Sequence, residues 1–312
     1  MRKNEVAVLG IDPGTSKSWS VVEARAKPGA SLGRLVPEPM EAWPHDSLEE
    51  GVEQVEERAR DHACLLVIDA PLRFPRTLAE ASFVPDEQNA HYPFDVNPFS
   101  TRPCERALRG KPRRKTLHES VRGLEAALQE LRAEAKKRRS TWFRHAEGVS
   151  VQPFMQAPHG PIVDAFLVAL RDAGLPVELS LEAMLSGSWE KGRVYVAESH
   201  PAVSMAMTPG VEAVPKYKGG SESVKNLVKQ LGPYASSVLA PPHPELHDDD
   251  DELDAFVSAL NGVSVVLGRA DVFGTDEHGY FLVPQRESGP AWRDLWREAA
   301  DGLPTKTSTS GR

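Results

Sequence analysis

Short apolar runs, rich in β-branched residues and separated by polar turns, dominate the first 70 residues of the chain. They predict strands at residues 6–11, 19–23, 35–43 and 65–68. Before the last of these strands, apolar residues at helical spacing follow Asp46-Ser47 and predict a capped helix. The chain therefore begins with three strands on short connections, then a helix, then a buried strand.

The pattern changes between residues 71 and 160. Residues 71–103 are rich in proline and aromatics without periodicity, so we expect an ordered loop or lid. Helical spacing then predicts one long amphipathic helix through Leu117, Val121, Leu124, Leu128 and Leu131. Beyond this segment, strands are predicted at 177–179, 193–197 and 279–284, and helices at 161–173 and 225–231. A further helix begins in the acidic run and has its buried stripe at Leu253, Phe256, Val257 and Leu260. Gly262 is predicted to end the last of these helices.

This order of elements predicts an α/β fold. We expect a ribonuclease H-like mixed sheet, with three antiparallel strands and then parallel strands, flanked by helices. Actin-type ATPase domains open in the same way. One domain is expected over residues 1–290, interrupted at about 71–160 by the loop and a helical basic insertion. Residues 291–312 are predicted to form a C-terminal helix and a disordered tail.

Composition narrows the class of protein. Hydrophobic content of 40% and charged content of 26% are typical of a soluble globular protein. No apolar run approaches the roughly 20 residues that span a bilayer, and the start leads into a strand instead of a signal peptide. Two cysteines cannot form a disulfide framework. We therefore expect a cytoplasmic protein that does not bind membranes.

Charge is unevenly distributed along the chain. Between Arg102 and Arg144 there are 14 Lys/Arg residues against 5 Asp/Glu, whereas the whole chain carries −8. A basic block in an acidic protein indicates a polyanionic partner. Four cations, Lys136, Lys137, Arg138 and Arg139, end the predicted long helix. A solvated helix end is the alternative, because cations there also complement the helix dipole.

Carboxylates mark the predicted strand ends and one helix start. Asp12, Asp69 and Glu198 each close a short apolar run, and Asp251 and Asp254 open the helix whose buried stripe begins at Leu253. An unpaired carboxylate at a buried strand end is costly to desolvate. Three strand ends and one helix start can share a sheet edge and form an oxygen cage for a hard divalent cation.

Several of these motifs also have other interpretations. Asp12-Pro13-Gly14 could form a hairpin turn, or Gly14-Thr15-Ser16 could wrap phosphates. Asp69 could cap a turn. His200 could shuttle protons or contact a phosphate, although a single histidine is more often a structural hydrogen-bonding residue. The acidic run at 248–252 could simply favour a helix N-terminus.

Several motifs occur together in a recognisable order. They are Gly10-Ile11-Asp12, Ile68-Asp69-Ala70-Pro71-Leu72, Arg102-Pro103-Cys104-Glu105-Arg106, Glu198-Ser199-His200-Pro201, Tyr217-Lys218, Asp251-Glu252-Leu253-Asp254-Ala255-Phe256 and Asp276-Glu277-His278-Gly279-Tyr280. From about residue 6 to 284 the chain resembles the domain-of-unknown-function family numbered 429, regarded as predicted ribonuclease H-like nucleases. Two of the motifs are also similar to those of Holliday-junction resolvases. The basic segment at about 111–144 departs from both.

The resemblance implies a two-metal phosphodiester hydrolase acting on DNA or RNA. Asp12 would bridge two Mg²⁺ or Mn²⁺ ions, Asp69 and Glu198 would complete one site, and Asp251 or Asp254 the other. The residues expected to contact substrate are Arg102, Lys216, Lys218, His200 and the cations Lys136, Lys137, Arg138 and Arg139.

Two other functions remain open on the sequence. An actin/hexokinase-like ATP-dependent phosphotransferase would use Asp12 and Thr15 for phosphate and Mg²⁺. It predicts a second glycine-rich phosphate loop and an adenosine-side Gly-Gly motif, of which Lys218-Gly219-Gly220-Ser221 is a poor version. The third possibility is a catalytically silent ribonuclease H-like module that binds nucleic acid. The sequence does not set the oligomeric state.

Overall fold

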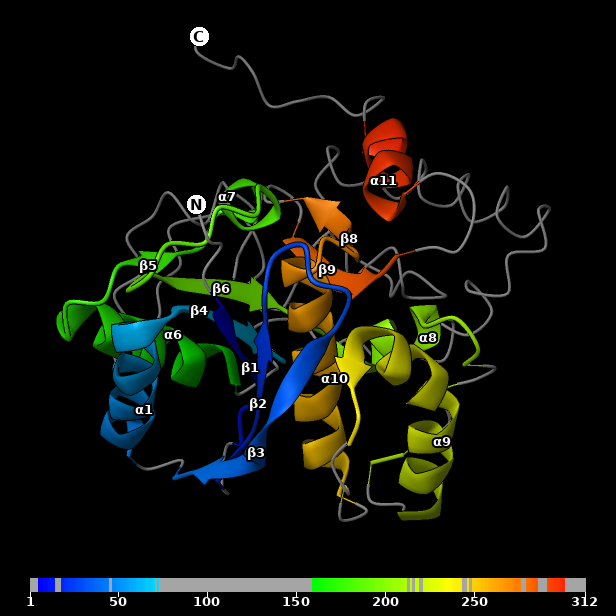
Figure 1. Ribbon diagram of the computed structural model, residues 1–312, viewed down its shortest axis with the longest axis horizontal. Coiled ribbons are helices and arrows are strands. Elements are labelled where there is room, and N and C mark those ends of the chain that lie inside the picture. Colours follow the sequence, from blue (N-terminus) through cyan, green and yellow to red (C-terminus); the bar gives the residue numbers. More distant parts are fainter. Residues whose placement is uncertain are drawn as a thin grey trace, which may run out of the picture.

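The computed structural model describes residues 5–14, 18–44, 47–70, 72, 159–211, 214, 217–218, 221–242, 246, 249–275, 279–285 and 291–300. Within these residues a seven-stranded sheet has the order β5-β6-β4-β1-β2-β3-β7 (Figure 1). Its strands are β1 (Val6–Asp12), β2 (Trp19–Ala26), β3 (Gly33–Trp43), β4 (Ala63–Ile68), β5 (Val177–Glu178), β6 (Val194–Glu198) and β7 (Leu239–Ala240).

The strand directions confirm the predicted mixed sheet. β1, β2 and β3 are antiparallel neighbours, whereas β4 runs parallel to β1, and β6 parallel to β4. This is the ribonuclease H-like arrangement expected from the sequence. The antiparallel strands follow one another on short connections, while each parallel strand needs a longer crossover.

Helices cover both faces of the sheet. α1 (Leu48–Asp61) and α6 (His159–Asp172) pack on one face, and α9 (Ser221–Val238) and α10 (Asp250–Val266) lie on the other (Figure 1). The side chains of β1 alternate between them: Val8 faces α10, whereas Leu9 and Ile11 face α1 and α6. Because both faces are covered, β1 and β4 are apolar along their whole length up to the final acids.

Two glycines let α10 lie directly on the sheet. A Cβ atom on Gly10 of β1 would stand 2.1 Å from the carbonyl oxygen of Ala255 in α10. One on Gly262 of α10 would stand 2.5 Å from the Val8 Cγ1 atom. The prediction that Gly262 ends this helix is therefore wrong: the helix continues to Val266, and the glycine is a point of close packing.

A small second sheet lies beside the main one. It pairs β8 (Ala270–Thr275), which the sequence analysis missed, with β9 (Gly279–Pro284). The helix α11 (Trp292–Ala300) packs on it, with the Trp296 and Phe273 rings 5.1 Å apart. Asp271 accepts hydrogen bonds from the backbone N–H groups of Val272 and Trp292, so one buried carboxylate ties the helix start to the hairpin.

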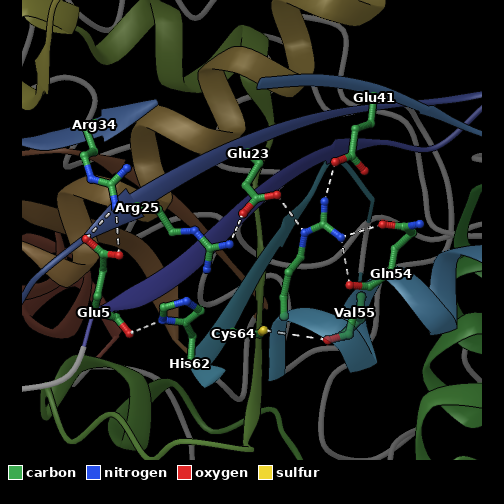
Figure 2. Close-up of polar contacts among 10 residues, drawn as sticks. Glu5, Glu23, Arg25, Arg34, Glu41, Gln54, Val55, His62 and Cys64 are labelled. Atoms are coloured by element: carbon green, nitrogen blue, oxygen red, sulfur yellow. Dashed lines mark hydrogen bonds and ion pairs between the residues drawn. The ribbon is translucent and has the colours of Figure 1, made fainter. Parts of the chain in front are cut away.

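A buried charged network joins α1 to the antiparallel strands. The Arg58 side chain donates to the Glu23 carboxylate at 2.7 Å and to Gln54, and it also contacts Glu41 (Figure 2). Glu23 has Arg25 as its second ion partner. Glu23 is only 3% exposed, so its negative charge is stabilised mainly by the two arginines and not by water.

The shorter helices complete the described chain. α7 (Leu181–Leu185) precedes β6, and α8 (Pro201–Met207) follows it. Among the helices that the structure describes, none has the length and apolar character needed to cross a membrane. Several predicted features lie outside the described residues: the loop at 71–103 apart from Leu72, the helix through 117–131, Arg102, Lys136, Lys137, Arg138, Arg139, Lys216 and the tail.

Candidate metal centre

Two carboxylates stand at the carboxyl ends of neighbouring parallel strands. Asp12 is the last residue of β1, and Asp69 directly follows β4. Ile11 pairs with Ile68, and the Asp69 N–H donates to the Ile11 carbonyl at 2.9 Å, so the two acids leave the sheet side by side. Strand alternation directs both toward the face that α10 covers.

The third carboxylate comes from α10. Asp254 lies one turn inside this helix and is fully buried. The close packing of Gly10 against Ala255 brings the helix down onto the end of β1. One carboxylate oxygen from each of Asp12, Asp69 and Asp254 can be chosen so that all three lie within 4.8 Å of one another. The structure thus brings together three of the acids that the sequence analysis selected.

The acids are held in an environment that disfavours their charge. Burial raises the pKa of Asp69 well above its usual 3.8, and the nearby Asp254 and Glu198 carboxylates raise it further. Burial also raises the pKa of Asp254, although Lys218 and Tyr217 act in the opposite direction. Such a site becomes more favourable when a cation is added, because the like charges are then neutralised.

Two residues of one segment bind Asp254. The Tyr217 hydroxyl donates to Asp254 Oδ1 at 2.8 Å, and the Lys218 ammonium contacts Oδ2. The ammonium also lies 3.6 Å from Asp250. Burial and the Asp254 carboxylate raise the pKa of Tyr217. Lys218, predicted as a phosphate contact, therefore lies against a site carboxylate. Tyr217 was not selected from the sequence, although the Tyr217-Lys218 pair was one of the recognised motifs.

Glu198 lies on the predicted edge but on the other face. It ends β6, where it pairs with Ile68 of β4. Val196, two residues earlier, packs on the face of α1 and α6, and alternation places Glu198 there too. Its Oε2 atom accepts a hydrogen bond from the Leu72 N–H at 3.0 Å. Glu198 is thus outside the close group, which consists of Asp12, Asp69 and Asp254. Its charge still raises the pKa of Asp69.

Asp251 is separated from the three acids by the helix geometry. It forms a second group with Asp249 and Asp250 at the start of α10, where Asp249 is exposed and the other two acids are half-buried. Asp249 caps the helix by accepting from the Asp251 N–H at 2.8 Å. The simpler interpretation of the acidic run, a favourable helix N-terminus, describes this group well. Of the two helix acids proposed from the sequence, Asp254 is the one that joins Asp12 and Asp69.

The neighbourhood of Glu198 is polar as well as charged. His200 is the N-cap of α8, and its ring meets the Phe281 ring edge-on at 5.6 Å. In the next layer Asn261 of α10 donates to the hydroxyls of Ser199 and Ser204, at 3.2 Å and 2.8 Å. These buried bonds fix the end of β6 against α10.

The donor set of the close group fits a hard divalent cation. It consists of carboxylate oxygens, which Mg²⁺ and Mn²⁺ prefer, and the close group contains no thiolate or imidazole. Hard divalent cations bind oxygen ligands at roughly 2.0–2.6 Å, with Mg²⁺ at the short end, so oxygens within 4.8 Å of one another are near the spacing of two ligands of one ion.

Comparison with known proteins places the chain in a family. No curated protein and no solved structure matches it. The family model described as "Protein of unknown function (DUF429)" matches residues 10–278, which include Asp12, Asp69, Glu198 and Asp254. This match confirms the resemblance to the domain-of-unknown-function family numbered 429. The chain belongs to the family Protein of unknown function (DUF429).

Proposed function

We propose that the protein is a metal-dependent nuclease, a phosphodiester hydrolase that uses two Mg²⁺ or Mn²⁺ ions. The observation that carries the proposal is the convergence of Asp12, Asp69 and Asp254 within 4.8 Å at the carboxyl edge of the sheet. Two of these acids stand at strand ends, and the third is fully buried on a helix. Without a cation, placing three carboxylates this close together lowers the stability of the fold. A role in binding cations would offset this cost, because a bound cation neutralises the like charges.

The residues would divide the work as follows. Asp12, Asp69 and Asp254 would hold the ions, and Asp12 would be the ligand that the two ions share. Bound divalent ions would supply an activated water and stabilise the leaving oxygen of the phosphodiester. Glu198 would act from the neighbouring strand through its effect on Asp69, or as a further ligand after its side chain turns.

Nucleic acid is the substrate class that the charge pattern supports. The acidic centre itself repels phosphate, so a nuclease needs cations nearby to hold its substrate. The sequence supplies them in the block of 14 Lys/Arg residues between Arg102 and Arg144. Contacts from such a block go to the phosphate backbone and do not read sequence. We therefore propose sequence-independent binding of DNA or RNA in the cytoplasm.

Metal-dependent stabilisation and cleavage test the proposal together. Mg²⁺ or Mn²⁺ should raise the melting temperature of the wild type without ATP, and labelled single- and double-stranded DNA and RNA should be cut in Mn²⁺. Asp12→Asn should lose both effects, whereas Asp61→Asn, which changes an exposed acid, should keep them. Stabilisation that requires ATP would favour a phosphotransferase. Metal binding with no cleavage of any substrate would favour a silent nucleic-acid-binding module.

A further inference from the structure

Lys218 places a positive charge against the most buried acid of the candidate centre. Its side chain is 51% exposed, yet its ammonium contacts the Oδ2 atom of Asp254, whose side chain is only 1% exposed. The lysine stem thus extends from the surface and delivers its charge into the site. Lys218 is therefore an ion partner of Asp254 supplied by the chain itself.

The second oxygen of Asp254 also has a donor. Tyr217 donates its hydroxyl to Oδ1 at 2.8 Å. Both carboxylate oxygens that could serve as metal ligands are therefore already hydrogen-bonded, one to a neutral group and one to a cation. The two donors differ in consequence: a neutral hydroxyl can share a carboxylate oxygen with a metal ion, whereas an ammonium repels that ion at short range.

Lys218 is held by more than one acid. Besides Asp254 it has Asp250 at 3.6 Å. The ammonium is therefore the counter-ion of two acids at the start of α10, and one of them, Asp254, belongs to the candidate metal centre.

We propose that the Lys218 ammonium holds the cation position beside Asp254, so that a second divalent ion binds there only after Lys218 leaves. This inference rests on the proposed metal-dependent function and adds an order of binding to it. The first ion would be held by Asp12 and Asp69, and the second would compete with the Lys218 ammonium for Asp254. Once displaced, the half-exposed Lys218 side chain becomes available to a substrate phosphate.

Counting bound Mn²⁺ by electron paramagnetic resonance tests this competition on the full-length protein. The wild type should bind two Mn²⁺ ions, the first with higher affinity than the second. Lys218→Met should bind the second ion at least about five-fold more tightly, the lower end of typical coupling between sites. Lys218→Arg keeps the cation and should resemble the wild type. Tyr217→Phe removes the neutral donor from the same carboxylate and should change the second affinity much less.

Melting temperature gives a readout that is independent of activity. Without metal, Lys218→Met should melt below the wild type because Asp254 loses its ion partner, and Mn²⁺ should reverse the difference. Lys218→Gln, which keeps a donor without the charge, is a second neutral variant if the methionine variant does not fold. Lys191→Met removes an exposed cation paired with Asp61 and serves as the surface control.

The possible failures are distinguishable. Equal Mn²⁺ affinities and counts in the wild type and both neutral variants would overturn the competition and leave the nuclease proposal intact. Absence of Mn²⁺ binding in every variant, at millimolar concentration, would overturn both. Tighter binding of the second ion in Tyr217→Phe than in Lys218→Met would also overturn the competition. The affinity would then depend on how firmly Asp254 is held and not on the charge of Lys218.

Discussion

Gly10 of β1 and Ala255 of α10 lie backbone to backbone, so closely that a Cβ atom on residue 10 would stand 2.1 Å from the Ala255 carbonyl oxygen and 2.2 Å from the Ala259 nitrogen. Asp254 precedes Ala255, and Asp12 follows Gly10 by two residues. The missing side chain therefore sets the distance between the strand-borne and helix-borne acids. The glycine of the Gly-Ile-Asp motif is needed for this approach and not for a turn.

Gly10→Ala should destabilise the protein by about 3 kcal/mol, the upper end for overpacking, because rigid backbone and not a flexible side chain meets the new methyl group. Urea denaturation measures the change. Mn²⁺ affinity should fall as well, since α10 must move away from Asp12. Gly232→Ala in α9 meets no atom within 4 Å and should change stability by less than about 1 kcal/mol. A Gly10→Ala protein as stable as the wild type would contradict this account of the site.

The pH dependence of the metal-free protein should report the crowded acids. Burial, Asp254 and Glu198 raise the pKa of Asp69 well above 3.8, and Lys218 only partly opposes them. The pKa of Asp69 is higher in the folded protein than in the unfolded chain, where it is near 3.8. The resulting contribution to folding stability is fully present below pH 3.8 and is lost as the pH rises through the folded-state pKa. The wild type in chelator should therefore lose stability as pH rises from about 4.

Asp69→Asn should remove that loss. Its melting temperature should equal or exceed that of the wild type at neutral pH without metal, and the gap should close toward pH 4. Differential scanning fluorimetry across this range, with EDTA present, measures both curves. Asp61→Asn, at an exposed acid, is the matched control. Parallel curves for the wild type and Asp69→Asn would show that Asp69 carries no special electrostatic cost.

Much of the site could be predicted because strand ends are visible in sequence. Asp12 and Asp69 each terminate an apolar run, and parallel strands bring such ends to one edge. The choice between Asp251 and Asp254 could not be made from spacing. It depends on where α10 begins, and the start at Asp250 leaves Asp251 half-buried in the first turn while the fully buried Asp254 lies one turn deeper.

Other features depended on information that local pattern does not contain. The position of Glu198 at the sheet edge could be predicted. The face on which its side chain lies could not, because side chains alternate along β6 and a shift of one residue would move Glu198 to the opposite face. Gly262 has the position of a helix stop, and only the contact with Val8 reveals its packing role. The contact between Lys218 and Asp254 joins residues 36 apart, which no periodicity encodes.

The buried network around Arg58 should be costly to break. Arg58→Met would leave Glu23 with Arg25 as its ion partner and Glu41 without its contact to Arg58. Removing one member of a buried ion pair costs roughly 3–5 kcal/mol. Urea denaturation should show a loss in this range. Arg34→Met, which removes a more exposed pair with Glu5, should cost less than about 1 kcal/mol.

A double-mutant cycle separates pairing from packing in this network. The single variants Glu23→Gln and Arg58→Met should each destabilise strongly, but their losses should not add, because either change removes the same interaction. Additive losses would show that Arg58 stabilises α1 through its other contacts, chiefly the 2.9 Å bond to the Gln54 carbonyl.

Charge reversal in the basic segment should weaken nucleic-acid binding for all sequences alike. Each phosphate neutralised by Lys or Arg releases counterions, and log affinity falls with log salt by about 0.7–0.9 per contact. Reversing Lys136, Lys137, Arg138 and Arg139 to glutamate should therefore flatten the salt slope in filter-binding titrations. The control variant reverses four exposed cations elsewhere in the chain and so has the same net charge as the test variant. These cations are Lys27, Arg60, Lys191 and Lys229. If both quadruple variants lower affinity equally and leave the slope unchanged, the segment is only a solvated helix end whose cations complement the dipole.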